Sequence, residues 1–159
     1  MSDVWDARRV MVTGGTGMIG SWLVAELLSR GAAVTALVMD HDPRSLLVAS
    51  GAIDDVHVIN GRLERFDDVE RAIVSGACDT VFHLGAQAIV GVATRAPRMT
   101  FEANIQGSWN VLDAARLHGD LVERVVVASS DKAYGTADVL PYTEDQPARG
   151  THPYDVSKS

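Results

Sequence analysis

Two residues near the end of the chain, Tyr154 and Lys158, stand four positions apart. On a helix this spacing puts both side chains on one face. A free tyrosine is a poor base at neutral pH, and an adjacent ammonium group improves it because the charge stabilises the phenolate. Ser130 follows a short apolar run and is placed to hydrogen-bond the same substrate oxygen. Together the three residue types are suited to oxidising an alcohol, with the hydride passing to a nicotinamide.

A cluster of glycines near the start of the chain predicts a site for a pyrophosphate. Gly14, Gly17 and Gly20 are spaced by three residues, and Gly15 with the last two fits the pattern G-x-G-x-x-G. The cluster joins an apolar run to a helical pattern, so the chain turns sharply there. Glycine has no Cβ to keep the backbone away from a phosphate, and the helix N-terminus offers free N–H groups to its charge. A tight turn that binds no ligand is the alternative.

Asp40 ends the second apolar run, 20 residues after Gly20. A carboxylate at this point accepts hydrogen bonds from the ribose hydroxyls of an adenosine and repels a 2′-phosphate. It therefore favours NAD over NADP. Arg44, four residues later, weakens that preference slightly. The alternative for Asp40 is a solvated carboxylate in a loop.

Short β-branched runs alternate with longer stretches of helical period. The predicted strands are residues 9–13, 33–39, 56–59, 80–84 and 125–128, and the predicted helices are residues 19–30, 66–75 and 97–118. Strands of this apolar kind are buried on both faces, and their alternation with helices predicts an α/β fold with a doubly wound parallel sheet, the Rossmann fold. We expect residues 1–159 to form one NAD-binding domain of this type.

The region 133–153 has no clear period and is rich in glycine and proline, which is typical of a functional loop. A helix is expected to begin near Tyr154. Because few residues follow it, we expect this last turn to be weakly packed and to fray. The chain alone is therefore expected to have little or no catalytic activity.

Composition and charge restrict the partners. The formal net charge is −7, so no overall positive field attracts nucleic acid or anionic lipid. The lone Cys78 has no cysteine or histidine partners at metal-binding spacing, so no metal site is expected. The acidic start and the lack of a long apolar run favour a cytoplasmic protein without a membrane segment.

In five stretches the sequence resembles the extended short-chain dehydrogenase/reductase family, the NAD-dependent epimerases and dehydratases of nucleotide sugars. The stretches are residues 13–20, His83–Gln87, 104–112, 129–135 and 153–159. Within the family the chain is most similar to sugar-nucleotide 4,6-dehydratases, particularly the CDP-glucose type. Family members are about twice as long, which implies that the chain lacks the C-terminal part of the usual fold.

The resemblance implies a set of catalytic roles for Ser130, Asp131, Lys132, Tyr154 and Lys158. Tyr154 takes the proton of the sugar 4-hydroxyl, and Lys158 binds the nicotinamide ribose and the phenolate. Ser130 binds the 4-oxygen. Asp131 matches the acid that protonates the departing 6-hydroxyl, and Lys132 stands where many 4,6-dehydratases have a glutamate. The reaction implied is transient oxidation at C4 with loss of water across C5 and C6, which makes the enzyme a lyase.

The resemblance also implies tightly bound NAD. The positions that match the cofactor-binding residues of the family are Gly14, Gly17, Met18, Ile19, Gly20, Asp40, Leu84, Ala86, Asn104, Tyr154 and Lys158. One position departs from the pattern: after the third strand the family usually has Gly-Asp, and this chain has Gly61-Arg62. A guanidinium cannot accept the hydrogen bond of the adenine amino group, so the adenine must be held in another way.

Other functions stay open at this point. A nucleotide-sugar 4-epimerase or a reductase of the same family would share Tyr154 and Lys158 but would not need an acid at Asp131. A truncated, non-catalytic dinucleotide-binding module is the third possibility. We also expect a homo-oligomer, because a truncated sheet leaves an unpaired edge. His83 ends the fourth strand and is expected to be a hydrogen-bonded structural residue.

Overall fold

The computed structural model describes residues 3–40, 42–137 and 140–159. Five strands form one parallel sheet in the order β3-β2-β1-β4-β5. The strands are β1 (Arg9–Thr13), β2 (Ala33–Val38), β3 (His57–Asn60), β4 (Thr80–His83) and β5 (Arg124–Val127). The predicted fold class is confirmed, and each predicted strand agrees with the observed one to within one residue at either end.

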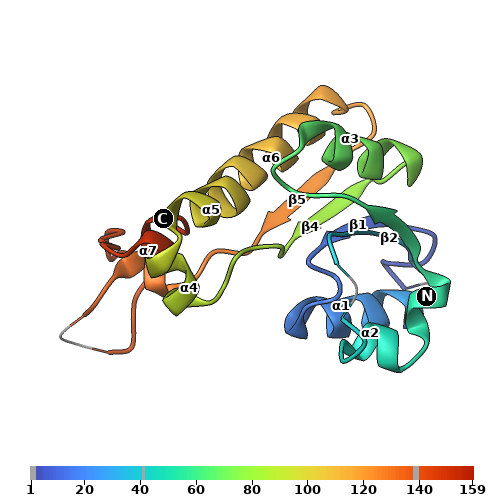
Figure 1. Cartoon of the computed structure of the whole chain (residues 1–159). Coiled ribbons are helices and arrows are strands. Elements are labelled where there is room, and N and C mark those ends of the chain that lie inside the picture. Colours follow the sequence, from blue (N-terminus) through green and yellow to red (C-terminus); the bar gives the residue numbers. More distant parts are fainter. Residues whose placement is uncertain (1–2, 41, 138–139) are drawn as a thin grey trace.

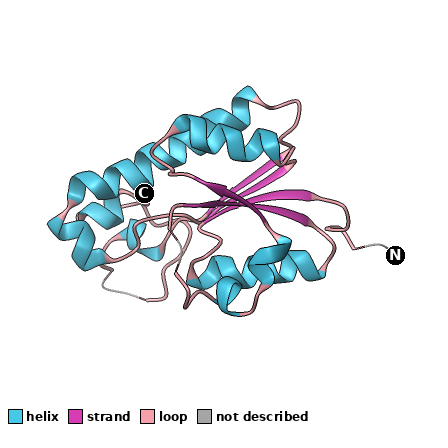
Figure 2. Cartoon of the chain, turned by 45° about the vertical axis from the view of Figure 1, so that its right-hand side comes forward, coloured by secondary structure: helices cyan, strands magenta, loops and turns pink. Residues whose placement is uncertain are grey.

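Helices cover both faces of the sheet (Figures 1 and 2). They are α1 (Met18–Ser29), α2 (Leu46–Ala49), α3 (Phe66–Ser75), α4 (Val90–Arg95), α5 (Pro97–Phe101), α6 (Gly107–Leu117) and α7 (Pro153–Val156). Two short 3₁₀ segments, η1 (Ala52–Asp55) and η3 (Asp131–Tyr134), and one π-helical segment, η2 (Glu102–Gln106), complete the structure. Helices α1 and α2 lie on one face, and α3 and α6 lie on the other (Figure 2). None of the helices in the described ranges has the length and apolar character needed to cross a membrane.

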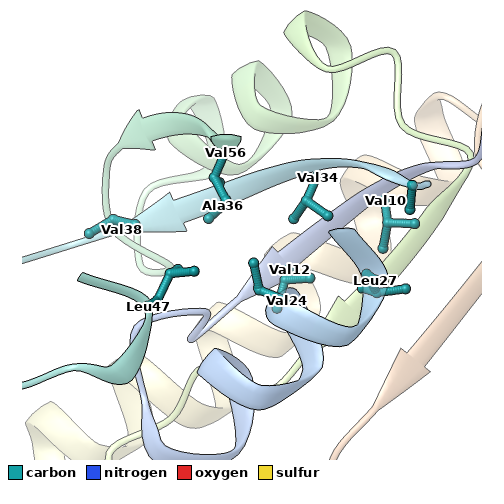
Figure 3. Close-up of a cluster of buried hydrophobic side chains, with 10 residues drawn as sticks. Val10, Val12, Val24, Leu27, Val34, Ala36, Val38, Leu47 and Val56 are labelled. Atoms are coloured by element: carbon teal, nitrogen blue, oxygen red, sulfur yellow. The ribbon is translucent and has the colours of Figure 1, made fainter. Parts of the chain in front are cut away.

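The alternation of side chains along β1 shows why both faces need a helical layer. Val10 and Val12 are fully buried against α1 and α2, where Val24 and Leu47 belong to the same apolar cluster (Figure 3). Met11, between the two valines, is equally buried on the opposite face against α3 and α6. Successive residues of a strand point to opposite faces, so a strand without polar residues requires apolar cover on both sides.

The prediction of one continuous helix over residues 97–118 is wrong. The segment is divided into α5, η2 and α6, and a wide turn closes where the N–H of Gly107 donates to the carbonyl of Glu102. A turn of this kind contains one extra residue and rotates the side chains that follow it. Asn104 and Ser108, whose contacts are described below, lie in and beside this turn.

The carboxyl ends of four strands meet at one edge of the sheet. Thr13 at the end of β1 pairs with Leu37 of β2 and with His83 of β4, and His83 pairs with Val127 of β5. From β1 the sheet grows on one side through β2 and β3, and on the other side through β4 and β5. The strand order therefore reverses between β1 and β4. Ligands of open α/β sheets bind in the crevice at this point.

Candidate functional site

The glycine turn after β1 is packed too closely to accept side chains at two positions. Gly14 has a φ of +71°, and a Cβ there would stand 2.8 Å from the backbone nitrogen of Gly85. A Cβ at Gly20 would stand 2.0 Å from the carbonyl oxygen of Gly14. These two glycines therefore let the loop after β4 and the first turn of α1 lie directly against the turn.

The N-terminus of α1 is open to a negatively charged ligand. Gly17 is the N-cap residue, provides no side-chain cap, and is followed by no acidic residue in the first turn. Met18 and Ile19 are largely exposed, while Gly20 is buried. Uncapped N–H groups and the positive end of the helix dipole fit a phosphate. The residues present therefore fit the pyrophosphate of a dinucleotide, as the sequence predicted.

A cavity of about 370 Å³ opens between α1 and α2, beside the glycine turn. Its lining includes Thr16, Trp22 and Arg44. The guanidinium of Arg44 is paired with Asp42, at 3.1 Å between Nε and Oδ1. Asp40 is exposed two residues beyond the end of β2, and it does not line this cavity. The sequence indicated only that the charge of Arg44 affects the choice between NAD and NADP, and it did not predict that Trp22 lines a cavity.

The loop after β4 is held by Asn104. The side-chain oxygen of Asn104 accepts from the N–H of Gln87 at 2.7 Å, and its Nδ2 donates to the carbonyl of Gln87 at 3.2 Å. Leu84 and Ala86, the two predicted cofactor-binding residues of this loop, are half-buried. Asn104 is buried in the wide turn, and it fixes the loop that borders the glycine turn.

A second cavity, about 520 Å³, lies at the carboxyl end of β5. Ser130, Asp131 and Lys158 line it, as do Glu144 and Gln146 of the long loop. The hydroxyl of Ser130 donates to Asp131 Oδ1 at 3.1 Å and accepts from the N–H of Lys132 at 3.2 Å. The structure thus brings three of the five predicted catalytic residues to one cavity.

The other two predicted catalytic residues lie outside that lining. Lys132 is exposed in η3, and Tyr154 is half-buried in α7. Lys158 lies beyond the end of α7, and its N–H donates to Asp155 rather than completing a turn with Tyr154. Helix α7 ends at Val156, so Lys158 lies outside it, and among the described residues no hydrogen bond joins the Tyr154 and Lys158 side chains.

The last turn, which was expected to fray, is bonded to three residues outside it, Ala128, Ser129 and Asn104. The Nζ of Lys158 donates to the carbonyl of Ala128 at 3.0 Å, and the Lys158 carbonyl accepts from the hydroxyl of Ser129 at 2.5 Å. The Nδ2 of Asn104 donates to the hydroxyl of Ser157 at 2.8 Å. These contacts join the turn to the loop after β5 and to the wide turn. Partial burial of its ammonium group lowers the pKa of Lys158.

The long loop is closed at its base. The N–H groups of Arg149 and Gly150 both donate to the carbonyl of Ala133, at 3.0 Å each. Within the loop the ring of Tyr142 stacks on Tyr134, with 5.6 Å between the ring centroids. The predicted loop, residues 133–153, is shorter in the structure: residues 133 and 134 end η3 and Pro153 begins α7, and the described residues between them contain no helix or strand.

His83 is buried between Thr13 at the end of β1 and Ser108 in the first turn of α6. Its Nδ1 is 2.7 Å from the hydroxyl of Thr13, and its Nε2 is 2.9 Å from the hydroxyl of Ser108. Burial, and secondly the positive charge of Lys158, lower the pKa of His83 to about 4. The expectation of a hydrogen-bonded structural histidine is confirmed, but the sequence did not reveal its partners.

Arg62, where the chain departs from the family pattern, lies two residues after the end of β3 and is bonded to acidic residues of the following segment. Its N–H donates to Asp68 Oδ2 at 3.0 Å, and its guanidinium is 3.5 Å from Glu64. Asp68 also accepts from the guanidinium of Arg71 at 3.0 Å, so both oxygens of this carboxylate already accept hydrogen bonds within the protein.

Comparison with known proteins agrees with this arrangement. The family model described as GDP-mannose 4,6 dehydratase matches residues 11–159. A UDP-glucose 4-epimerase of Oryza sativa subsp. japonica is 33% identical over 156 residues, which cover 94% of this chain and 41% of the relative. The CDP-glucose 4,6-dehydratase of Salmonella typhimurium is 32% identical over 158 residues, which cover 97% of this chain and 43% of the relative.

The solved structures include a UDP-glucose-4-epimerase from Stenotrophomonas maltophila with bound NAD and formylated UDP-arabinopyranose. It superposes with a TM-score of 0.82 at 29% sequence identity, covering 95% of this chain and 45% of the epimerase. The chain thus spans less than half the length of these relatives. The family match extends from β1 to the last residue. The chain belongs to the family of the GDP-mannose 4,6-dehydratase model, among the NAD-dependent epimerases and dehydratases of nucleotide sugars.

Proposed function

We propose that this chain provides the NAD-binding fold and the catalytic edge of an enzyme that transiently oxidises a nucleotide sugar at C4. The glycine turn, the uncapped N-terminus of α1 and the loop held by Asn104 are the parts that would hold NAD. Bound NAD would supply the acceptor for the C4 hydride and the donor that later returns it. Relatives crystallised with NAD support this assignment.

Residues in and beside the larger cavity would bind the sugar and transfer its protons. Ser130 hydrogen-bonds the sugar 4-oxygen, and Tyr154 on α7, which lies against η3, takes the proton of the 4-hydroxyl. The positive charge of Lys158 favours the phenolate and binds the nicotinamide ribose. Because Lys158 now donates to the Ala128 carbonyl, substrate or cofactor must compete with that bond.

Within this chemistry we propose a 4,6-dehydratase, with CDP-glucose as the leading substrate. The observation that carries this proposal is the position of Asp131, which lines the cavity together with Ser130 and Lys158. In its protonated form Asp131 would donate a proton to the departing 6-hydroxyl, while the C5 hydrogen, acidified by the 4-keto group, leaves as a proton. The identity to the CDP-glucose 4,6-dehydratase of Salmonella typhimurium supports this substrate.

A 4-epimerase is the second candidate. The relative named UDP-glucose 4-epimerase is as similar to this chain as the dehydratase is, at 33% against 32% identity. An epimerase oxidises and reduces the same carbon and loses no water, so it does not need the acid at Asp131.

The experiment that separates the candidates is a product assay on the complete gene product. CDP-glucose and UDP-glucose are incubated with the protein and NAD, and the products are resolved by mass spectrometry. A dehydratase yields a product lighter by one water, and Asp131→Asn lowers its rate at least about 100-fold, the ordinary effect of losing a general acid. Asp113→Asn is the matched control, because Asp113 is an exposed aspartate paired with Arg116 on α6.

The other outcomes are equally informative. An epimeric product of unchanged mass, formed at the same rate by Asp131→Asn, contradicts the dehydratase and supports the epimerase. Calorimetry with NAD is carried out on the same samples. If NAD does not bind, the proposal as a whole fails and only a scaffold role is left for the chain.

A further inference from the structure

A buried row of polar groups runs beneath the candidate site, and the chemistry described so far does not use it. It begins at the N–H of Gly85, passes through the side chains of Thr13, His83 and Ser108, and ends at the carbonyl of Asn104. The exposed fractions of Thr13 and His83 are 1% and 2%. Buried polar rows of this kind are costly unless every member is satisfied.

The two ends of the row fix the direction of every hydrogen bond in it. A backbone N–H can only donate, and that of Gly85 donates to Thr13 Oγ1 at 3.0 Å. A backbone carbonyl can only accept, and that of Asn104 accepts from the hydroxyl of Ser108 at 2.5 Å. Ser108 has no second proton, so His83 Nε2 must donate to it. Thr13 then donates its proton to His83 Nδ1.

A neutral imidazole protonated on Nε2 is the only form that satisfies the whole row. If Nδ1 also carried a proton, Thr13 Oγ1 would face two donors and its own hydroxyl proton would lose its acceptor. Lys158 is the charged group that acts on His83, and its positive charge opposes protonation. The low pKa of His83, about 4, agrees with the direction of the bonds.

The row joins the two halves of the candidate site. At one end Thr13 immediately precedes the glycine turn. At the other end, the carbonyl of Asn104 accepts the last bond of the row. The side-chain amide of Asn104 makes two hydrogen bonds with the backbone of Gln87, and it also donates to the hydroxyl of Ser157. The row therefore passes from the ends of β1 and β4, at Thr13 and His83, to the first turn of α6, at Ser108.

We propose that His83 is a positioning residue that fixes the wide turn at Asn104 through Ser108 and thereby couples the dinucleotide site to the Tyr154–Lys158 turn. The inference rests on the proposed function only in its statement that the glycine turn holds NAD. The Ser108 hydroxyl donates to the Asn104 carbonyl four residues earlier, and it accepts from His83, so the imidazole is linked to the wide turn through one side chain.

The test uses Ser108→Ala, which removes the last link and leaves His83 bonded to Thr13. We expect the amide of Gln87 to exchange with solvent about tenfold faster and the affinity for NAD to fall about tenfold, the effect of losing one buried hydrogen bond. Ser108→Thr keeps the hydroxyl and restores both values. Ser75→Ala is the matched control, because Ser75 donates to the carbonyl four residues earlier in the same way but lies at an exposed position at the end of α3.

A spectroscopic measurement tests the same inference without NAD. Nitrogen-15 NMR of the wild-type protein at pH 7 should show His83 with a proton on Nε2 and none on Nδ1. The opposite tautomer, or an exchange rate of Gln87 that Ser108→Ala leaves unchanged, overturns the inference. If the wild-type protein fails to bind NAD while these two results hold, the proposed function fails and the positioning role of His83 stands.

Discussion

Gly20 is the residue at which the turn allows least change. An alanine Cβ at this position would lie 2.0 Å from the carbonyl oxygen of Gly14, so the backbone of the turn would have to shift. We predict that Gly20→Ala lowers the free energy of unfolding by about 1–3 kcal/mol, the usual cost of overpacking. Affinity for NAD should fall at least tenfold because the N–H groups of the turn move.

Urea denaturation and calorimetry measure these two effects. Gly91→Ala is the control, because no atom lies within 4 Å of its added Cβ and it sits in helix α4. Alanine is the better helix former by about 1 kcal/mol, so the control should keep or gain stability. A Gly20→Ala protein with the stability and NAD affinity of the wild type would contradict the packing described here.

His83 gives the protein a calculable dependence on pH. The pKa of an unfolded histidine is about 6.5, and that of folded His83 is about 4. Below pH 6.5 the unfolded chain binds a proton that the folded protein does not. The free energy of unfolding therefore falls as the pH drops toward 4, by about 2–3 kcal/mol at pH 4.5 for this group alone.

Urea curves at pH 7 and pH 4.5 check this prediction. His83→Gln should lose less stability between the two pH values than the wild type, whereas His57→Gln, at an exposed position, should lose as much as the wild type. An equal loss in all three proteins would mean that His83 is protonated in the folded state.

At the scale of elements, the sequence predicted the strands well because their signal is local. Val10, Met11 and Val12 are apolar and β-branched or bulky, and a strand buried on both faces needs nothing else. Helix α3 has the predicted ends, residues 66 and 75, because its apolar face repeats regularly. Both elements depend mainly on residues that are neighbours in sequence.

Other features could not be predicted because their causes are distant in sequence. The wide turn at η2 is tied to His83, which lies 25 residues before Ser108. Lys158 leaves the helical path and reaches the Ala128 carbonyl, 30 residues earlier in the chain. Helix α4 contains Gly91 and is only six residues long, so its period is too short to recognise. The residue types of the site were therefore predictable, whereas the contacts among them were not.

At the scale of the whole molecule, one side of the sheet leaves apolar side chains in contact with water. Trp109 and Leu112 on α6 are 57% and 49% exposed, and Val126 and Val127 on the edge strand β5 are 48% and 43% exposed. Exposed apolar groups of this size seek partners, and an unpaired strand adds open backbone groups. We therefore predict that the protein self-associates through this side.

Sedimentation velocity over a range of concentrations tests the prediction. The double variant Trp109→Glu, Leu112→Glu should shift the protein toward monomer. Val74→Glu, which places the same charge at an exposed apolar position on α3, should leave the association unchanged. A wild-type protein that remains monomeric at high concentration would refute the prediction.

The two hydrogen bonds that Ala133 accepts at the base of the long loop also have a practical consequence. They hold the two ends of the loop together, so a peptide inserted within the loop would lengthen it without separating Ala133 from Arg149. Because Glu144 and Gln146 of the same loop line the cavity beside Ser130, such an insertion would change the wall of the cavity and leave its base in place.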